Sequence, residues 1–578
     1  MAEFNLSSFQ KDILAFFKSH PHDNMFIEAS AGSSKTFILV EMSKITTSSD
    51  VYIAFNSSIA EEVRSKIKNQ KVKVYTIHAL ALSIMNTNLK NYPTKKVEIG
   101  SGIGIRRNND SSGAKLDNFK IQKILDEMID ESEGSYCDYD QRIFLKDNYS
   151  TLYNLCRLTC TDLENPLYIG KLMQDYQLFE TDKENIEIPN VFDICKNLKE
   201  LDTLSAIMFD QTNVVDFTDM VYITYNKLKS GEWQVPYWHL YTNVLNDEIQ
   251  DNNNLLTNFI PFIMRKGGRL VGVGDKNQSC YAFAGSNAKS FSMIPEKFAP
   301  VERFNLPICY RCPVSHLDYV KYKLPEIDIR PRPNAPEGEI DEIEKEEIVD
   351  YVQPGDMVIS RKNKWLAPVI LDLAKEGISI CIQDKDFVNN VFKSLKRTNV
   401  KKLDTLQNKL TKSISNFKKN IKIAQELSNE FDHMSPEDKV KAQKEKVETI
   451  LDSNTQIDVT NFILVILNNY IEDHPNGRVE DFERFLKHIL NTTPKPDAVR
   501  ICSIHKAKGL EADNVFVLNR GDWTERYGQT KEQLQQEKNL SYIAWTRAKD
   551  KLYLVGEPEA EEHDDNELPQ DDGNFFFL

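Results

Sequence analysis

The chain has 578 residues, a formal net charge of −15 and a hydrophobic fraction of 40%. It is too long for a single hydrophobic core, and no run approaches the roughly 20 apolar residues that a membrane-spanning helix needs. The negative charge excludes a protein that coats nucleic acid through bulk charge. A local basic groove stays compatible with it, because attraction to phosphate acts over about one Debye length.

The first residues contain no basic segment followed by an apolar run, so we expect no secretory signal. The nine cysteines are scattered and odd in number, which is typical of a reduced compartment. We therefore expect a cytoplasmic protein with no membrane partner. The spacings Cys156-x3-Cys160 and Cys309-x2-Cys312 leave a zinc site open. Buried free thiols are favoured, since structural zinc needs four ligands in a recognisable pattern.

The first 85 residues alternate between helix and strand patterns. We predict helices at residues 6–17, 36–44 and 59–67 and strands at 24–29, 51–55 and 73–76. This order predicts a parallel sheet. Residues 86–205 are polar with helical patches, and we interpret them as a helical insertion. The αβ pattern returns over residues 206–300, with a buried strand at 270–274.

A second αβ unit is predicted from residue 301 to 389, with strands at 355–360 and 378–382 around a helix at 365–375. A Lys-rich helical insertion follows at 390–495, and the αβ pattern resumes over 496–557. The final segment, 558–578, is acidic with an aromatic tip and is expected to be disordered. The predicted fold class is α/β, with two αβ units that each carry a mainly helical insertion.

The helical insertion of the second unit carries a basic run. The run could contact duplex DNA or a displaced strand, and a solvated helical face stays equally open. Its members are Lys393, Lys396, Arg397, Lys401, Lys402, Lys409, Lys412, Lys418, Lys419 and Lys422.

The turn after the first predicted strand, Ala31-Gly32-Ser33-Ser34-Lys35-Thr36, has the layout of a phosphate-binding loop. Backbone N–H groups at a helix N-terminus face an anion, and the lysine adds a point charge. The threonine hydroxyl can bind Mg²⁺. Ala29 and Ser34 stand where the G-x-x-x-x-G-K-[ST] pattern has glycines, so an ordinary strand–helix turn stays open for this segment alone.

Two further polar segments follow predicted strands. Asp247 and Glu248 are adjacent acids after a short apolar run. Phosphoryl transfer needs one carboxylate near the metal and one that orients the attacking water, and this pair can meet both demands. Gly274-Asp-Lys-Asn-Gln278 also follows a strand, where polar groups face the ligand crevice of a parallel sheet. Taken alone, the Asp247–Glu248 segment is better explained as an exposed acidic turn.

Together and in order, these segments resemble motifs I, II and III of UvrD/Rep/PcrA-type superfamily 1 DNA helicases. The resemblance extends along nearly the whole chain. The other similar segments are Leu6-x3-Gln10 (Q motif), Ala54-Phe55-Asn56 (Ia), Thr76-Ile77-His78 (Ib), Asp216-Phe217-Thr218-Asp219, Cys309-Tyr310-Arg311 (IV), Ile504–Glu511 (V) and Tyr542–Ala548 (VI). It implies two RecA-like P-loop NTPase domains that bind ATP and Mg²⁺ between them.

The resemblance also implies roles for individual residues. It implies that Gln10 reads adenine, Tyr310 stacks on it and Glu511 contacts the ribose. The remaining implied roles are phosphate binding by Ala31, Gly32, Ser33, Ser34 and Lys35, Mg²⁺ binding by Thr36 and Asp247, water activation by Glu248, γ-phosphate sensing by Gln278, and arginine fingers at Arg311 and Arg547.

The residues implied to line a single-stranded DNA path are Phe55, His78, Tyr281, Phe283 and His505. Aromatic rings stack on any base, so they bind single-stranded DNA without sequence preference. Burial in the core is the alternative for each of them.

The leading hypothesis is a motor that hydrolyses ATP, moves 3′ to 5′ on single-stranded DNA and unwinds duplex at junctions. An ATP-gated DNA-binding or recruitment protein with weak turnover is the alternative, because Ser34 replaces a glycine. A nucleotide kinase is disfavoured, since it needs no second RecA-like domain. The acidic tail with its aromatic tip could bind a replication or recombination protein, and a loose end stays equally open.

Overall fold

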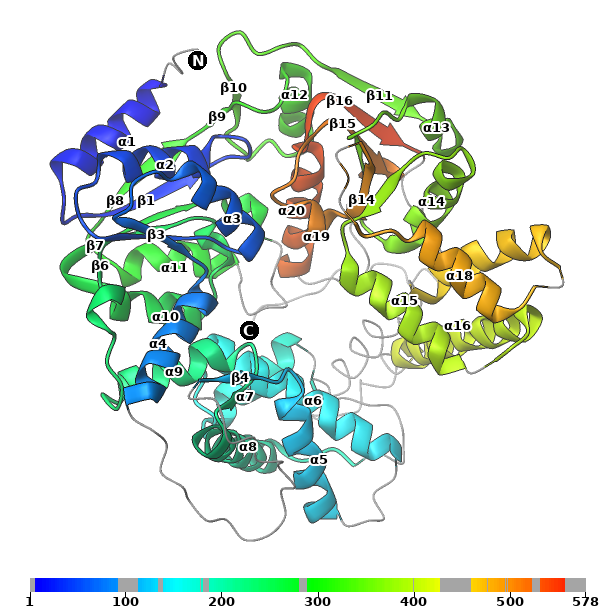
Figure 1. The fold of residues 1–578 in the computed structure, drawn as a ribbon, viewed down its shortest axis with the longest axis horizontal. Helices are drawn as coiled ribbons and strands as arrows, with labels where there is room; N and C mark the ends of the chain where they lie inside the picture. The colour runs from blue at the N-terminus through cyan, green and yellow to red at the C-terminus, as the bar shows by residue number, and fades with distance from the viewer. Residues whose placement is uncertain are drawn as a thin grey trace, which may run out of the picture.

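Two six-stranded parallel sheets organise the chain (Figure 1). The strand order is β3–β2–β6–β7–β1–β8 in the first sheet and β11–β16–β15–β12–β14–β13 in the second. The predicted α/β class is therefore confirmed. The structure is a computed structural model, and it describes residues 6–91, 113–133, 139–176, 178–179, 187–279, 288–398, 400–426, 459–475, 477–493, 495, 497–521 and 531–556.

The first domain is built around the N-terminal sheet. Its strands are β1 (Asn24–Ala29), β2 (Asp50–Ile53), β3 (Val72–Tyr75), β6 (Tyr241–Asn246), β7 (Met264–Gly274) and β8 (Val301–Leu306). Its helices are α1 (Ser8–Ser19), α2 (Lys35–Ile45), α3 (Ser57–Lys66), α4 (Ile77–Asn91), α9 (Asp219–Lys229), α10 (Asn254–Ile263) and α11 (Ala288–Lys297).

The edge strand β8 differs from the sequence expectation, which began the second unit at residue 301. It pairs in parallel with β1 and so belongs to the first sheet. Its side chains are mostly exposed or half-buried. Such a polar edge strand carries no alternation that would indicate which sheet it joins.

A helical insertion, called 1B here, interrupts the first domain. It comprises α5 (Lys120–Glu133), α6 (Tyr139–Thr159), α7 (Pro166–Tyr176) and α8 (Val191–Thr212), beside a two-stranded ribbon of β4 (Lys115–Leu116) and β5 (Val214–Val215). These helices enclose a hydrophobic core of their own. In Figure 1, 1B lies below the first sheet as a separate body.

A buried ionic cluster joins 1B to the first domain. Asp219, at the start of α9, accepts hydrogen bonds from Lys120 at 2.6 Å and from Arg157 at 2.7 Å. Arg157 also contacts Asp216 at 2.8 Å. The Lys120 and Asp219 side chains are fully buried. Removing one member would leave an unpaired buried charge, so the cluster holds 1B firmly against α9.

The second domain is built around the C-terminal sheet, with a short ribbon of β9 (Ile308–Cys309) and β10 (Arg330–Pro331) at its start. The sheet strands are β11 (Glu339–Ile343), β12 (Met357–Ser360), β13 (Ile380–Ile382), β14 (Val499–Ser503), β15 (Ala512–Leu518) and β16 (Ala548–Val555). The helices are α12 (Val314–Lys323), α13 (Ile348–Tyr351), α14 (Leu366–Lys375), α19 (Ile504–Ala507) and α20 (Lys531–Trp545).

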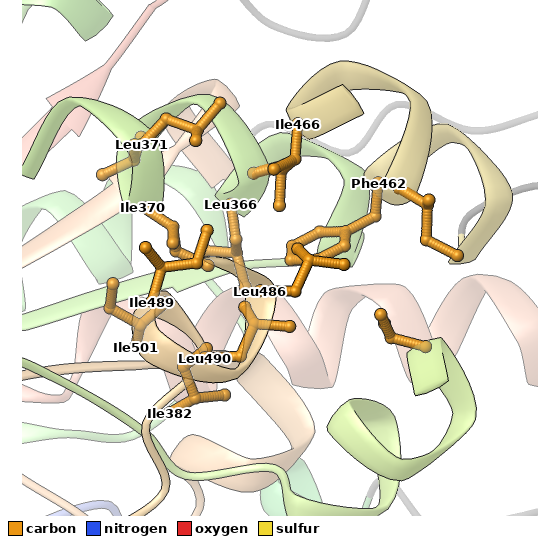
Figure 2. Close-up of a cluster of buried hydrophobic side chains, with 14 of the residues drawn as sticks. Leu366, Ile370, Leu371, Ile382, Phe462, Ile466, Leu486, Ile489, Leu490 and Ile501 are labelled. Carbon is orange, nitrogen blue, oxygen red and sulfur yellow. The ribbon is translucent and has the colours of Figure 1, made fainter. Parts of the chain in front are cut away.

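The helical insertion of the second domain, called 2B here, comprises α15 (Lys385–Thr398), α16 (Leu403–Glu426), a helical stretch over residues 459–473, and α18 (Val479–Ile489). It packs differently from 1B, because its helices share one core with the second sheet. Figure 2 shows Phe462 and Ile466 of 2B meeting Leu366 and Ile370 of α14. We conclude that 2B is continuous with its parent domain.

The basic run is exposed where its side chains are described. These lysines, on α15, α16 and the link between them, are Lys393, Lys396, Lys401, Lys402, Lys409 and Lys412. No helix in the described ranges is long and apolar enough to cross a membrane. The tail from residue 558 lies outside the described residues.

Candidate nucleotide site and DNA path

The predicted phosphate loop connects β1 to α2 and therefore lies at the carboxyl edge of the first sheet. Ser34 precedes the helix with φ 69° and ψ 39°, in the left-handed region. This conformation costs an L-residue roughly 1–2 kcal/mol, whereas glycine adopts it freely. Ser34 thus keeps the backbone course that glycine would favour.

Gly32 brings the loop into contact with the second domain. A Cβ added to Gly32 would lie 2.7 Å from Cys309 Sγ and 2.8 Å from Arg311 Cβ, and its φ is +64°. Only glycine fits such a close approach. The Gly32 carbonyl accepts a hydrogen bond from the Tyr310 N–H at 2.8 Å, and the Ala31 N–H donates to the Tyr542 hydroxyl at 2.7 Å.

The loop also meets the two predicted acids. Lys35 Nζ lies 2.9 Å from Glu248, and the Thr36 hydroxyl donates to Asp247 at 2.8 Å. Asp247 and Glu248 follow β6, the strand beside β2 and β7. Glu248 has a φ of 51°, and left-handed residues of this kind cluster at functional sites. The structure therefore brings these four side chains together.

Sequence reasoning missed Tyr52, which completes this cluster. Its hydroxyl donates to Asp247 at 2.5 Å from a fully buried position on β2. Burial and the nearby Asp247 charge raise its pKa well above the usual value, so the phenol stays protonated as a donor. The only sequence signal was a tyrosine inside an otherwise apolar buried strand.

Charge in the cluster is unevenly distributed. Burial opposes ionisation of Glu248, but Lys35 and Lys508 outweigh it and bring the Glu248 pKa down to about 2. Burial and the Glu248 charge instead raise the pKa of Asp247. A bound cation beside Asp247 would relieve this repulsion, because an opposite charge favours the ionised carboxyl.

The second domain supplies two arginines at the cleft. Arg311 Nε donates to Glu511 at 2.7 Å and its NH1 to the Thr546 carbonyl at 3.0 Å. Arg547 donates to the carbonyls of Ile543 at 2.9 Å and Leu510 at 3.3 Å. These bonds all lie within the second domain. Glu511, for which the resemblance implies a ribose contact, is therefore an ion-pair partner of Arg311.

Gln10 and Tyr310, the two residues that the resemblance implies contact adenine, lie together. The Tyr310 hydroxyl is 3.3 Å from Gln10 Oε1. The same oxygen accepts the Ser7 N–H at 3.0 Å in a capping box at the start of α1. Gln10 Nε2 is buried and has no hydrogen-bond partner among the described residues.

Two unsatisfied polar atoms fit a nucleotide at this site. Gln10 Nε2 is placed to donate to a base, and the Ser33 hydroxyl in the phosphate loop is also buried and unpaired. The hydroxyl of Thr36 and the carboxylate of Asp247 are hard oxygen donors, which Mg²⁺ prefers. The residues therefore fit ATP and Mg²⁺.

A buried ion pair crosses the cleft beside this site. Lys508, after α19, contacts Asp251 at 2.6 Å, and their side chains are 6% and 0% exposed. Lys508 also donates to the Gln278 carbonyl at 2.5 Å. The Gln278 side chain donates to Asp275 at 2.7 Å. Sequence reasoning quoted Lys508 within motif V but gave it no role.

The implied DNA residues are only partly described. Tyr281 and Phe283 lie outside the described residues. Phe55 follows β2, and Lys508 Nζ lies 5.9 Å from its ring. His505 lies on α19 at the same cleft, and burial together with Arg361 lowers its pKa to about 4. A neutral His505 can offer a ring face but no positive charge to a phosphate.

His78 and Phe217 form an aromatic stack where 1B joins the first domain. Their ring centroids are 4.1 Å apart with planes 19° from parallel. Phe217 is 54% exposed, so solvent reaches part of its ring. Burial lowers the pKa of His78 to about 4. Phe217 was quoted in the resemblance without a role, and its exposed face makes it a candidate for base stacking.

The cysteine spacings do not form a zinc site in the described part of the chain. Cys156, Cys160, Cys309 and Cys312 are free thiols, and no group of three or more potential metal ligands was found among the described residues. Burial explains them better, because Cys156, Cys309 and Cys312 are all buried.

Comparison with known proteins matches both halves of the chain. Residues 10–299 match the UvrD/REP helicase N-terminal domain, and residues 202–557 match the UvrD-like helicase C-terminal domain. These matches support two RecA-like domains, as predicted.

Individual relatives are also named as DNA helicases. A probable DNA helicase II homolog of Mycoplasma pneumoniae is 23% identical over 92% of this chain and 81% of its own length. A Rep ATP-dependent DNA helicase of Buchnera aphidicola subsp. Baizongia pistaciae is 22% identical over 49% of this chain and 38% of its own. DNA helicase II of Escherichia coli is 28% identical over 18% of this chain and 14% of its own. The chain belongs to the UvrD-like helicase family.

Proposed function

We propose that this chain, a DNA helicase that uses ATP, moves 3′ to 5′ along single-stranded DNA and opens duplex at junctions. The supporting observation is the contact between the phosphate loop and the second domain, where the Ala31 N–H donates to the Tyr542 hydroxyl. A nucleotide at this loop must act on both domains at once. Its binding and release can therefore change the distance between the two domains, which is the movement a translocating motor needs.

The proposed chemistry follows from the grouping around the loop. Lys35 and the loop N–H groups bind the phosphates, and Thr36 and Asp247 hold Mg²⁺, which would neutralise phosphate charge when bound. Glu248 orients and deprotonates the attacking water. Arg311 and Arg547 leave their present carbonyl and carboxylate partners to stabilise charge on the transferred phosphoryl group.

For DNA, we propose that Phe217 and Phe55 stack on bases, with Tyr281 and Phe283 continuing the path as the sequence predicts. The exposed lysines of 2B would bind duplex phosphates ahead of the junction. Binding of a replication or recombination protein by the acidic tail stays a prediction from the sequence.

Forked DNA with either a 3′ or a 5′ single-stranded tail tests this function. We expect ATP-dependent unwinding from the 3′ tail, and ATP hydrolysis that rises when single-stranded DNA is added. Lys35→Ala should abolish both. Lys44→Ala is the matched control, because Lys44 lies on the same helix but is exposed and pairs with Glu41. No ATPase response to single strands would refute the motor, and unwinding from the 5′ tail alone would refute the direction.

The ATP-gated binding protein is the second candidate, and it rests on Ser34. In that case the serine would impair the loop and limit turnover. The left-handed φ of Ser34 speaks for the motor, because the loop keeps the backbone path that glycine would give. Replacing Ser34 by glycine separates the two candidates.

A further inference from the structure

Two cysteines flank the proposed nucleotide residues of the second domain. Cys309 ends β9 and Cys312 precedes α12, so the chain reads Cys309-Tyr310-Arg311-Cys312. The exposed fractions of Cys309 and Cys312 are 0% and 1%. Neither thiol has a role in the chemistry proposed above.

The two cysteines are in direct contact. The Cys312 backbone N–H donates to Cys309 Sγ at 3.3 Å, and the Cys312 thiol donates to the Thr546 carbonyl at 3.6 Å. A disulfide needs Cα atoms about 4.4–6.8 Å apart and side chains that converge, and this short turn already brings the thiols together.

The pKa values of the two thiols are shifted in opposite directions. Its hydrogen bonds from Cys312, together with the Arg311 charge, outweigh burial and lower its pKa to about 7. The pKa of Cys312 is raised well above its usual value, because its thiol donates to Cys309 and is buried. Other buried thiols differ, since burial raises the pKa of Cys502 to about 12. A thiolate is the form that reacts with oxidants.

The pair also lies against the phosphate loop. A Cβ on Gly32 would meet Cys309 Sγ at 2.7 Å, so this sulfur touches the loop backbone. Between the cysteines, the Tyr310 N–H donates to the Gly32 carbonyl and Arg311 contacts Glu511. A bond between the two sulfur atoms would therefore also restrict the positions of Tyr310 and Arg311.

We propose that Cys309 and Cys312 form a peroxide-sensitive dithiol, and that its oxidation to a disulfide reversibly stops ATP turnover. The Cys309 thiolate attacks one oxygen of hydrogen peroxide and the O–O bond breaks. The sulfur becomes a sulfenic acid, while the other oxygen leaves as hydroxide. The Cys312 thiol gives its proton to that hydroxide, and its sulfur then attacks the Cys309 sulfur. The sulfenic oxygen takes up a proton and departs as the second water, so two thiols lose two electrons and one peroxide becomes two waters.

The expected effect on turnover follows from the small ring that the disulfide closes. Tyr310 and Arg311 lie inside this ring, so their backbone loses the freedom to rotate toward a nucleotide. The Cys309 sulfur is also drawn from the Gly32 backbone toward Cys312. The disulfide itself does not depend on the proposed function, whereas its effect on turnover does.

Mass spectrometry of the full-length protein gives the first test. Trypsin cleaves after Arg303, Arg311 and Lys321, so the two cysteines fall in separate peptides, 304–311 and 312–321. After hydrogen peroxide treatment and digestion without reductant, we expect these peptides to be joined by a disulfide. Dithiothreitol should separate them. If they remain unlinked at peroxide doses that leave the fold intact, the proposal is wrong.

ATP turnover gives the second test. Peroxide should lower the ATPase rate of the wild-type protein at least tenfold, and dithiothreitol should restore it. Cys312→Ala should keep its rate in reductant and resist the reversible loss, and Cys312→Ser serves if the alanine variant does not fold. Cys502→Ala, at a buried thiol outside the 309–312 turn, should respond like wild type. An equal loss in both Cys312 variants, or a linked pair with unchanged turnover, would overturn the inference.

A failure of the proposed function gives a different pattern. The reduced wild-type protein would then lack DNA-stimulated ATPase activity from the start. The linked peptides would still report whether the dithiol oxidises, and binding of a fluorescent ATP analogue to the oxidised and reduced forms would replace turnover as the second readout. A linked pair that leaves analogue affinity unchanged would overturn the proposed effect on the loop.

Discussion

Replacing Lys508 by alanine should separate the two domains without touching the phosphate loop. Lys508 contacts Asp251 at 2.6 Å across the cleft, and both side chains are almost fully buried. Removing one partner of a buried pair costs about 3–5 kcal/mol, because the other charge stays buried and unpaired. Since the pair joins two domains, this free-energy cost destabilises the closed arrangement of the domains rather than either domain itself. At about 1.4 kcal/mol per tenfold, even 3 kcal/mol lowers the equilibrium constant for closure about 100-fold.

The assay is steady-state ATP hydrolysis with saturating single-stranded DNA. We expect kcat/KM of Lys508→Ala to fall at least 100-fold while the melting transition of each domain stays close to wild type. Lys506→Ala is the matched control, because Lys506 is 45% exposed and lies 3.9 Å from Asp384. Adding Asp251→Asn should recover part of the loss, since the unpaired charge is then gone. A rate within threefold of wild type, or losses that simply add in the double variant, would refute this reasoning.

Four further predictions each concern a single residue. Burial raises the pKa of Asp251 to about 6, although Lys508 opposes this shift. As the pH falls through 6, Asp251 is protonated, the ion pair with Lys508 is lost and the ATPase rate should decline. Asp251→Asn should remove this decline from the pH–rate profile. Tyr52→Phe removes a hydrogen bond to the buried Asp247 carboxylate, and denaturant titration should show a loss of about 1.5–3 kcal/mol in the free energy of unfolding. Phe217→Ala should weaken single-strand binding in a fluorescence titration by about 1–3 kcal/mol, the usual contribution of one stacked base. Ser34→Gly should change turnover less than threefold if the chain is a motor, and a rise above tenfold would favour the ATP-gated binding protein.

Sequence spacing predicted the parts of the site that are local in the chain. Strand, turn and helix follow one another around Lys35, and Asp247 with Glu248 directly follows a strand. Each local pattern predicts the secondary structure of its own segment. A parallel sheet then places such strand ends at one edge, which is why separate motifs converge.

The missed residues depend on pairing between distant segments. Tyr52 and Asp247 are 195 positions apart, and Lys508 and Asp251 are 257 apart. A buried tyrosine or lysine has no local pattern that reveals its partner. The assignment of β8 failed for the same reason, because a polar edge strand can join either sheet. The core shared by 2B and the second sheet also required the packed structure.

The ion pairs of Lys35 and Arg311 indicate how nucleotide binding would time catalysis under the proposed roles. Lys35 now pairs with Glu248 and contributes to its pKa of about 2, which makes this carboxylate a weak base. Phosphates bound at the loop would draw Lys35 away from Glu248. The Glu248 pKa would then rise, and a carboxylate with a higher pKa accepts a proton from water more readily. Glu248 would thus become a stronger base only once ATP is bound. Arg311 would still have to leave Glu511 before it stabilises charge on the phosphoryl group. Hydrolysis would then require both exchanges of partner, one in each domain.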